Sequence, residues 1–149
     1  MNKPTLFHPD DFRAILNRVE SLQPGAQRLW GKMTVDQMLA HCCMPIEQGL
    51  GILELPKEGT MISRWVIKQF VLRANRFQPN LPTAKPFVIR ETNGFEAEKA
   101  RLKANLKELS RRGINGPWAQ HNLFGTLKPE AWGRLTYVHL DHHLRQFSG

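Results

Sequence analysis

Cysteine is scarce in this chain of 149 residues, and long hydrophobic runs are missing altogether. The two cysteines, Cys42 and Cys43, are adjacent, and neighbouring cysteines rarely close a structural disulfide. A secreted scaffold held by disulfides is therefore excluded, and we expect two buried thiols on a helix. No apolar run approaches the ~18 residues of a membrane-spanning helix, and residues 1–10 lack a signal-peptide pattern. We therefore expect a cytoplasmic protein with no membrane partner.

Acidic residues are missing from residues 64–90, where six basic residues occur before Glu91. These six are Arg64, Lys68, Arg73, Arg76, Lys85 and Arg90. With the net charge of +8, they could attract nucleic acid, lipid or an acidic small molecule, although a solvated basic surface is the simpler interpretation. Nucleic acid is disfavoured because the segment has no recognisable binding motif and its aromatic residues have helix-core spacing. One hypothesis is that the segment holds carboxylates of a thiol cofactor or an acidic substrate.

Apolar residues recur at helical spacing through most of the chain. The pattern predicts long helices over residues 10–22, 34–53, 94–112 and 129–147 and a shorter one over 61–75. Length and a 41% hydrophobic composition fit one domain over residues 1–149. Strand alternation is weak, with a short candidate at 87–90. We therefore predict an all-α helical bundle whose site lies in the core between facing helices.

Capping residues and prolines mark the ends and interruptions of these helices. Residues 34–37, Thr-Val-Asp-Gln, form a capping-box pattern that begins the second helix, and Asn93 can cap the fourth. Pro45 lies inside the second helix, where its ring clashes with the carbonyl of His41, so we expect a kink or local unwinding there. Residues 77–92 contain three prolines and should form a long irregular loop that lines a site.

Three of the six histidines crowd onto the last predicted helix, namely His139, His142 and His143. An α-helix turns about 100° per residue, so all three fall in one sector of roughly 120° that also carries core residues. His139 and His143 lie one turn apart, a spacing at which two imidazoles can hold one metal ion. Asp141 projects about 160° from His139 and should point away from the cluster.

Two interpretations of this cluster are open from the residues alone. The histidines could be neutral core residues held by hydrogen bonds, but three imidazoles within five residues are hard to satisfy by packing. Two or three histidines plus water describe an open catalytic metal site better than a structural site, which wants four protein ligands. A third ligand must come from elsewhere. His41 is the best candidate, because it lies in the middle of the second helix, on a polar line and beside the expected kink, and His121 in the loop before the last helix is the second. His8 is expected on the surface.

The same residues resemble the DinB-like superfamily, which includes metal-dependent hydrolases and thiol transferases. The resemblance rests on His41 in a Thr-capped second helix and on His-x-x-His-His-x-x-Gln over residues 139–146. The run from Trp118 to Phe147 resembles an uncharacterised subfamily within it. The resemblance implies an up-up-down-down four-helix bundle, often dimeric, to which this chain adds a short helix and a long Pro-rich loop.

The resemblance also implies a metal triad with zinc or nickel as the metal, and neighbouring pocket residues. The triad would be His41, His139 and His143, with His142 and Gln146 beside it. The chain departs from the superfamily where Leu144-Arg145 stands in place of Arg-Gly, and residues 55–92 have no counterpart in the minimal fold. The ligand set is unaffected by these departures, whereas the pocket floor and the substrate cannot be carried over.

We expect a metal-dependent enzyme with a small-molecule substrate. In the favoured reaction, of S-transferase type, the metal presents the thiolate of a low-molecular-weight thiol to a small electrophile; in the alternative, a hydrolase, metal-bound water attacks. His121 or His142 could act as the general base, because imidazole titrates near neutral pH, and Gln146 is the third catalytic candidate. A non-catalytic helical binding or structural protein is the remaining interpretation.

The last helix also has a second apolar face, opposite the histidines. It consists of Tyr137, Leu140, Leu144 and Phe147. This face either packs inside the chain or forms the interface of a homodimer.

Overall fold

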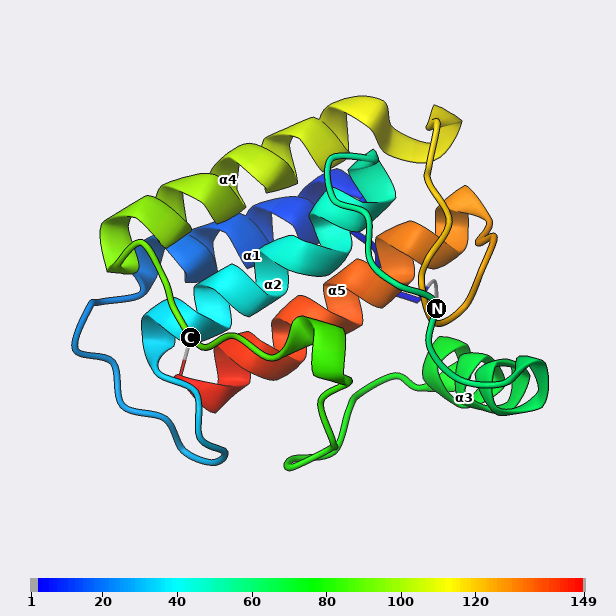
Figure 1. The fold of residues 1–149 in the computed structure, drawn as a ribbon. Coiled ribbons are helices and arrows are strands. Elements are labelled where there is room, and N and C mark those ends of the chain that lie inside the picture. The colour runs from blue at the N-terminus through cyan, green and yellow to red at the C-terminus, as the bar shows by residue number, and fades with distance from the viewer. Residues whose placement is uncertain (1–2, 149) are drawn as a thin grey trace.

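The computed structural model describes residues 3–148, which are all-helical (Figure 1). The five α-helices are α1 (Pro9–Ser21), α2 (Val35–Leu50), α3 (Met61–Arg73), α4 (Phe95–Arg112) and α5 (Pro129–Gln146). Two short 3₁₀ turns, η1 (Lys85–Phe87) and η2 (Gly113–Asn115), lie in the connections. Within the described residues there is no strand, only an isolated bridge between His121 and Gly125. The candidate strand at 87–90 does not form. The 3₁₀ turn η1 ends at its first residue, Phe87, and the described residues contain no strand with which it could pair.

Four helices, α1, α2, α4 and α5, lie side by side around one core, whereas α3 stands apart beside α5 (Figure 1). The core residues of α4 are Leu102, Leu106 and Leu109, all fully buried as their helical spacing predicted. The all-α prediction is therefore confirmed, while the DinB-like, up-up-down-down character of the bundle stays a prediction. No helix in the described part of the chain combines the length and apolar character needed to cross a membrane.

Helix α2 is the central element and is buried along nearly its whole length. Its capping box is present: the Thr34 hydroxyl accepts from the Gln37 backbone N–H, and the Gln37 side chain accepts from the Thr34 N–H. The unwinding expected beside His41 does not occur, because α2 continues as α-helix through Pro45. A proline inside a helix costs about 3 kcal/mol. Packing against α4 and α5 on both sides offsets this cost and keeps the helix intact.

Cys42 and Cys43 are fully buried in this core, as expected for structural thiols. Burial raises the pKa of Cys43 to about 12 and that of Cys42 well above its ordinary value. Only the thiolate is a good nucleophile or metal ligand. Both cysteines therefore act as small apolar core residues.

The start of α4 differs from the expectation that Asn93 caps it. The N-cap is Gly94, and no side chain caps the helix there. Asn93 instead turns toward Glu98, whose carboxylate accepts from the Asn93 backbone N–H at 3.1 Å and from its side-chain amide at 3.2 Å. Glu98 is 2% exposed and needs these donors, so its demand outweighs the local capping preference.

The aromatic and aliphatic residues of α3 do not form the core that their spacing suggested. Trp65 and Phe70 are each 63% exposed. A small apolar contact and polar contacts hold this helix in place: Val71 and Leu72 pack against the cluster of Phe124, Leu127 and Trp132. Arg64 donates to the Leu123 carbonyl at 2.9 Å, and Lys68 donates to the Phe124 carbonyl at 3.2 Å. Two of the six cations of residues 64–90 thus serve as anchors for α3.

The second apolar face of α5 packs inside the chain. Leu140 and Leu144 are fully buried and Phe147 is 4% exposed, all three within the same core as α2 and α4. This face is therefore unavailable to a partner. A homodimer stays a prediction, but the α5 face that suggested it is buried in the core of the chain.

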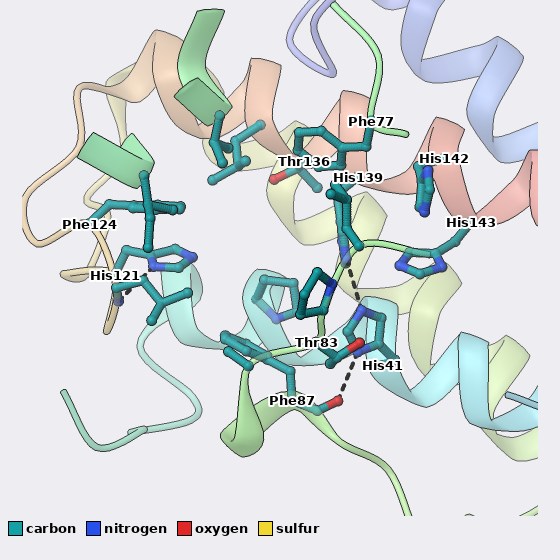
Figure 2. A pocket seen from close by; sticks show the side chains of 18 of the residues that line it. His41, Phe77, Thr83, Phe87, His121, Phe124, Thr136, His139, His142 and His143 are labelled. Atoms are coloured by element: carbon teal, nitrogen blue, oxygen red, sulfur yellow. Dashed lines mark hydrogen bonds between the residues drawn. The ribbon is translucent and has the colours of Figure 1, made fainter. Parts of the chain in front are cut away.

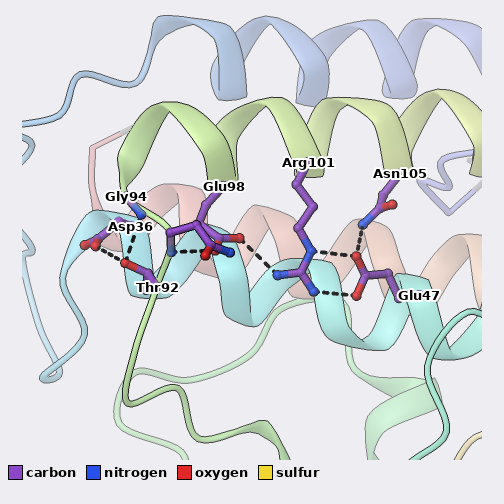
Figure 3. Close-up of polar contacts among 8 residues, drawn as sticks. Asp36, Glu47, Thr92, Gly94, Glu98, Arg101 and Asn105 are labelled. Carbon is purple, nitrogen blue, oxygen red and sulfur yellow. Dashed lines mark hydrogen bonds and ion pairs between the residues drawn. The ribbon is translucent and has the colours of Figure 1, made fainter.

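A buried ion-pair network joins α2 to α4 (Figure 3). Arg101 donates to Glu47 through two nitrogens, at 2.7 and 2.5 Å, and to Glu98 at 3.0 Å. Asn105 completes the site with a 2.9 Å hydrogen bond to Glu47. Burial raises the pKa of Glu47, but the hydrogen bonds from Arg101 and Asn105 outweigh it, so the net pKa is lowered. The carboxylate therefore stays ionised and stabilises the fold.

We predict that Glu47→Gln lowers the free energy of unfolding at neutral pH by about 1–3 kcal/mol, because a charged, hydrogen-bonded partner of Arg101 is lost. A lowered folded-state pKa stabilises above the unfolded value of 4.5 and loses this effect as pH falls through the folded pKa. Urea denaturation at neutral pH and below pH 4.5 should therefore show a variant deficit that shrinks in acid. Glu54→Gln, in an exposed loop, is the control. An equal deficit at both pH values would contradict this account.

Candidate metal centre

A cavity of about 240 Å³ opens between α2, α3, α5 and the loops around residues 77–87 and 121–124 (Figure 2). Five of the six histidines of the chain line it. The Pro-rich loop contributes Phe77 and the run from Leu81 to Ala84, together with Phe87 of η1. This loop was expected to line a site, and the structure places it at the cavity.

Three imidazoles meet at one side of the cavity: His41 of α2 and His139 and His143 of α5. Their ligand nitrogens all lie within 4.8 Å of one another, and the Nε2 atoms of His41 and His139 are 3.0 Å apart. The histidine that joins the α5 pair is His41, whereas His121 stands on the opposite side of the cavity (Figure 2). The structure thus brings together the triad that the resemblance implied.

A backbone carbonyl fixes the protonation of His41. Its Nδ1 lies 2.8 Å from the carbonyl oxygen of Phe87, which can only accept, so Nδ1 carries the proton and donates. In the neutral ring Nε2 then holds a lone pair, and this is the atom that faces His139. Burial lowers the pKa of His41, although the Phe87 carbonyl raises it, and the net shift favours the neutral ring.

A relay through Gln146 fixes His143 in the same way. The Gln146 amide nitrogen donates to the Trp30 carbonyl at 2.8 Å, so its oxygen faces the Nδ1 of His143 at 3.0 Å. An amide oxygen only accepts, so His143 carries its proton on Nδ1 and leaves an Nε2 lone pair. Gly31 makes room for the relay, because a Cβ there would stand 2.6 Å from the Gln146 amide nitrogen. Burial lowers the pKa of His143 to about 3, which keeps it neutral.

His139 completes the group without a second partner. Its Nδ1 is buried with no hydrogen-bond partner, and its Nε2 is the atom turned toward His41. Burial, and then the neighbouring His143 and His41, hold its pKa well below the ordinary value. All three imidazoles are therefore neutral, the form in which histidine binds a metal.

These three nitrogens fit the first shell of a divalent ion. Zinc binds histidine at about 2.0–2.1 Å in a tetrahedral arrangement, which places ligand nitrogens ~3.3 Å apart. The His41–His139 separation of 3.0 Å and the 4.8 Å limit for the whole group bracket this spacing. Hydrogen bonds from Nδ1 to a carbonyl or an amide are the usual way a protein orients a metal-binding histidine. Three neutral imidazole nitrogens suit several divalent transition metals and leave further positions open.

His142 lies beside the triad but outside it. Its ring packs near those of Trp30 and Phe77, at 5.7 and 6.0 Å between centroids, and contacts His143 at 4.9 Å. Burial lowers its pKa, and its Nδ1 is buried with no hydrogen-bond partner. The structure therefore places it against the wall of the site, where a role as general base stays a prediction.

His121 faces the cavity from the far wall, stacked on Phe124 at 4.4 Å between ring centroids. Its Nδ1 accepts the backbone N–H of Leu123 at 3.1 Å, so the neutral ring carries its proton on Nε2. Burial, and then the charge of Arg64, lower its pKa to about 4. His121 is thus set up as a hydrogen-bond donor to a bound molecule, which weakens the expectation that it acts as a base.

Among the described residues, no charged side chain lines the cavity. Asp141 points away, as the helix geometry predicted, and binds Arg18 and Arg145 at 2.8 and 2.9 Å. None of the six cations of residues 64–90 lines the cavity. The hypothesis that they hold a carboxylate of the substrate or cofactor therefore finds no support at this site.

The sequence did not predict two groups of the site, the backbone carbonyls of Phe87 and Trp30. They lie 46 and 116 residues from the side chains that they orient. Any residue type supplies a backbone carbonyl, so no residue pattern marks them. Only Gln146, three residues after His143, carried a local signal.

We predict that 15N NMR of the metal-free protein shows neutral His41 and His143 both protonated on Nδ1. Gln146→Leu should release the His143 proton from Nδ1 and leave His41 unchanged, because only the first loses its acceptor. Gln120→Leu, at an exposed position, is the matched control. Nε2-protonated His143 in the wild type would refute the relay.

Comparison with known proteins gives the chain a family. No curated protein and no solved structure matches it. A family model described as "Protein of unknown function (DUF1569)" matches residues 1–149, the whole chain. That description names no activity. The chain belongs to the DUF1569 family.

Proposed function

We propose that this protein is a metal-dependent enzyme of the DinB-like type that activates a low-molecular-weight thiol for transfer to a small electrophile. His41, His139 and His143 would hold a divalent ion, zinc or nickel, with its open positions toward the cavity. His142 and Gln146 would support the site from its wall, and His121 would contact the bound substrate.

The fixed tautomers of His41 and His143 are the observation that carries the proposal. Each ring is forced to donate through Nδ1, so two Nε2 lone pairs are available in one buried cluster. In a purely structural cluster, the Nε2–H of His139 could satisfy one of these acceptors and would leave the other without a donor. A metal ion accepts all three lone pairs at once, so the donor set supports a metal better than a hydrogen-bonded core.

The walls of the cavity support thiol transfer over hydrolysis. When bound, the ion supplies Lewis acidity that lowers the pKa of a coordinated thiol or water. A base beside the ion helps hydrolysis, and within the described residues no carboxylate lines the cavity and His121 offers a donor rather than a lone pair, which leaves His142 as the one candidate there. A thiol depends less on such a base, because its ordinary pKa of about 8.5 already lies far below that of water, so it can lose its proton to solvent. Its sulfur then bonds to the electrophilic carbon while the leaving group departs with its electron pair and takes up a proton.

The first prediction concerns metal binding. The wild type should bind one zinc or nickel ion per chain, and His41→Ala, His139→Ala and His143→Ala should each lose it. At a hundredfold excess over Kd, binding adds about 2.7 kcal/mol of stability, or roughly 5–10 °C in melting temperature. Elemental analysis and thermal melts with and without metal measure both effects.

His8→Ala is the matched control, because His8 is an exposed histidine outside the cavity. It should bind metal and melt like the wild type. If the wild type takes up no stoichiometric metal and His139→Ala melts like it in the presence of metal, the proposal fails.

The second prediction concerns the reaction. With zinc or nickel, the protein should speed the displacement of chloride from 1-chloro-2,4-dinitrobenzene by 2-mercaptoethanol at neutral pH by roughly tenfold or more. A free thiol is only a few per cent thiolate near pH 7, and the metal raises that fraction. Absorbance of the thioether reports the rate, which chelation and His139→Ala should abolish. Metal-dependent cleavage of 4-nitrophenyl acetate without any thiol transfer would instead favour the hydrolase.

A further inference from the structure

The cavity beside the triad carries no charged side chain among the described residues that line it. Its polar lining consists of five imidazoles, the Trp132 indole, and the hydroxyls of Thr83 and Thr136. The Thr136 hydroxyl is already used, because it donates to the Trp132 carbonyl at 2.8 Å. The remaining lining is aliphatic and aromatic, with Phe70, Phe77, Phe87 and Phe124 supplying rings. A charged ligand group would therefore meet no opposite charge from the protein.

The basic residues of α3 and of the loop after it do not line the cavity. Arg64 and Lys68 donate to backbone carbonyls of residues 123–126, and Arg73 and Arg76 lie exposed outside the cavity. The net charge of +8 therefore supplies no cation to the cavity lining, and Arg64 acts there only from outside it, through its charge on His121. The positive charge of the chain is therefore no argument for an anionic substrate.

The mouth of the cavity is apolar as well. Ile67, Phe70 and Leu81 line the cavity and are also 46%, 63% and 45% exposed. Ile67 and Phe70 belong to α3 and Leu81 to the Pro-rich loop, so two separate segments contribute exposed apolar side chains to the lining. An entering molecule thus exchanges water for apolar contacts from the entrance inward.

We propose that the cavity binds an uncharged, largely apolar molecule of roughly ten non-hydrogen atoms, with one hydrogen-bond acceptor directed at His121. The size follows from the 240 Å³ volume, given that a cavity of ~150 Å³ holds benzene. The acceptor follows from His121, which lines the cavity and carries its proton on Nε2 because its Nδ1 accepts from Leu123. The role of this molecule as the electrophile of the reaction depends on the proposed metal enzyme. Its binding to the cavity does not.

The physical reason is the cost of dehydration. A carboxylate or ammonium that enters this cavity loses its hydration and finds no counter-charge, whereas a neutral ring loses little. A buried polar group without a partner weakens binding by about tenfold to a hundredfold, and a charged group weakens it by more. Discrimination against charge should therefore exceed tenfold.

Acetophenone and benzoate test this directly, because they match in ring and in heavy-atom count and differ in charge. Both are titrated into full-length, chelator-treated protein, since a divalent ion would bind the carboxylate by itself. The indole signal of Trp132 in ¹H–¹⁵N NMR spectra reports binding in the cavity. We expect saturable shifts with acetophenone at a dissociation constant at least tenfold below that of benzoate. Benzylamine should also bind weakly.

Ile67→Lys places a cation at the mouth and should shift the preference toward benzoate by tenfold or more. Ile62→Lys is the matched control: it lies on the same helix, is 78% exposed and does not line the cavity, so it should leave the preference unchanged. Both positions are exposed, so both variants should fold.

Equal or tighter binding of benzoate to the wild type would overturn the proposal, and so would the absence of saturable binding by acetophenone. Neither result depends on metal uptake, which is measured separately. A metal-binding protein that prefers benzoate would retain the metal centre and refute the apolar substrate. A protein that binds no metal but prefers acetophenone would refute the metal centre and retain the apolar ligand.

Discussion

Two backbone carbonyls decide which nitrogen of the central imidazoles faces the cavity. A carbonyl can only accept, so Phe87 forces His41 to donate through Nδ1, and Trp30 forces the same on His143 through the Gln146 amide. If either acceptor were a donor, the neighbouring Nε2 would carry a proton and point it at the other rings. The ability of this cluster to take a cation thus follows from the direction of two loop carbonyls. The histidine side chains alone would not ensure it.

The loops that supply these carbonyls are held by the helices around them. Leu29 donates its backbone N–H to the Gln146 carbonyl at 2.7 Å, which ties the loop of Trp30 to the end of α5. Gly31 has φ +78°, where a side chain is disfavoured and would also meet the Gln146 amide. On the other side, the Phe87 ring is buried and meets the His41 ring edge-on. The buried helices α2 and α5 position the rings, and these loops then set their protonation.

The sequence predicted what depends on near neighbours along the chain. Helical periodicity and the Thr34 capping box located the helices, and the i, i+4 spacing of His139 and His143 located half of the triad. The errors lie where burial and tertiary packing, rather than local preference, decide the structure. Asn93 serves Glu98 instead of capping, α2 continues through Pro45 because its neighbours bury it, and α3 exposes the residues that its spacing assigned to a core. The place of His41 on a polar line of the second helix made it the favoured third ligand, and the family resemblance implied it as well, although no local pattern relates it to a helix about a hundred residues away.

The distribution of charge links the metal to its substrate. Arg64, Lys68 and Arg134 donate to backbone carbonyls that anchor α3, so cations that do not line the cavity hold the helix that forms part of its wall. With a divalent ion on the triad, a cation about 6 Å away would cost about 5 kcal/mol even at an effective dielectric of about 20. A basic group in the cavity would therefore expel the metal as well as attract anions. The absence of Lys and Arg from the described lining fits the metal that we propose, and an apolar surface for the proposed substrate is its direct consequence.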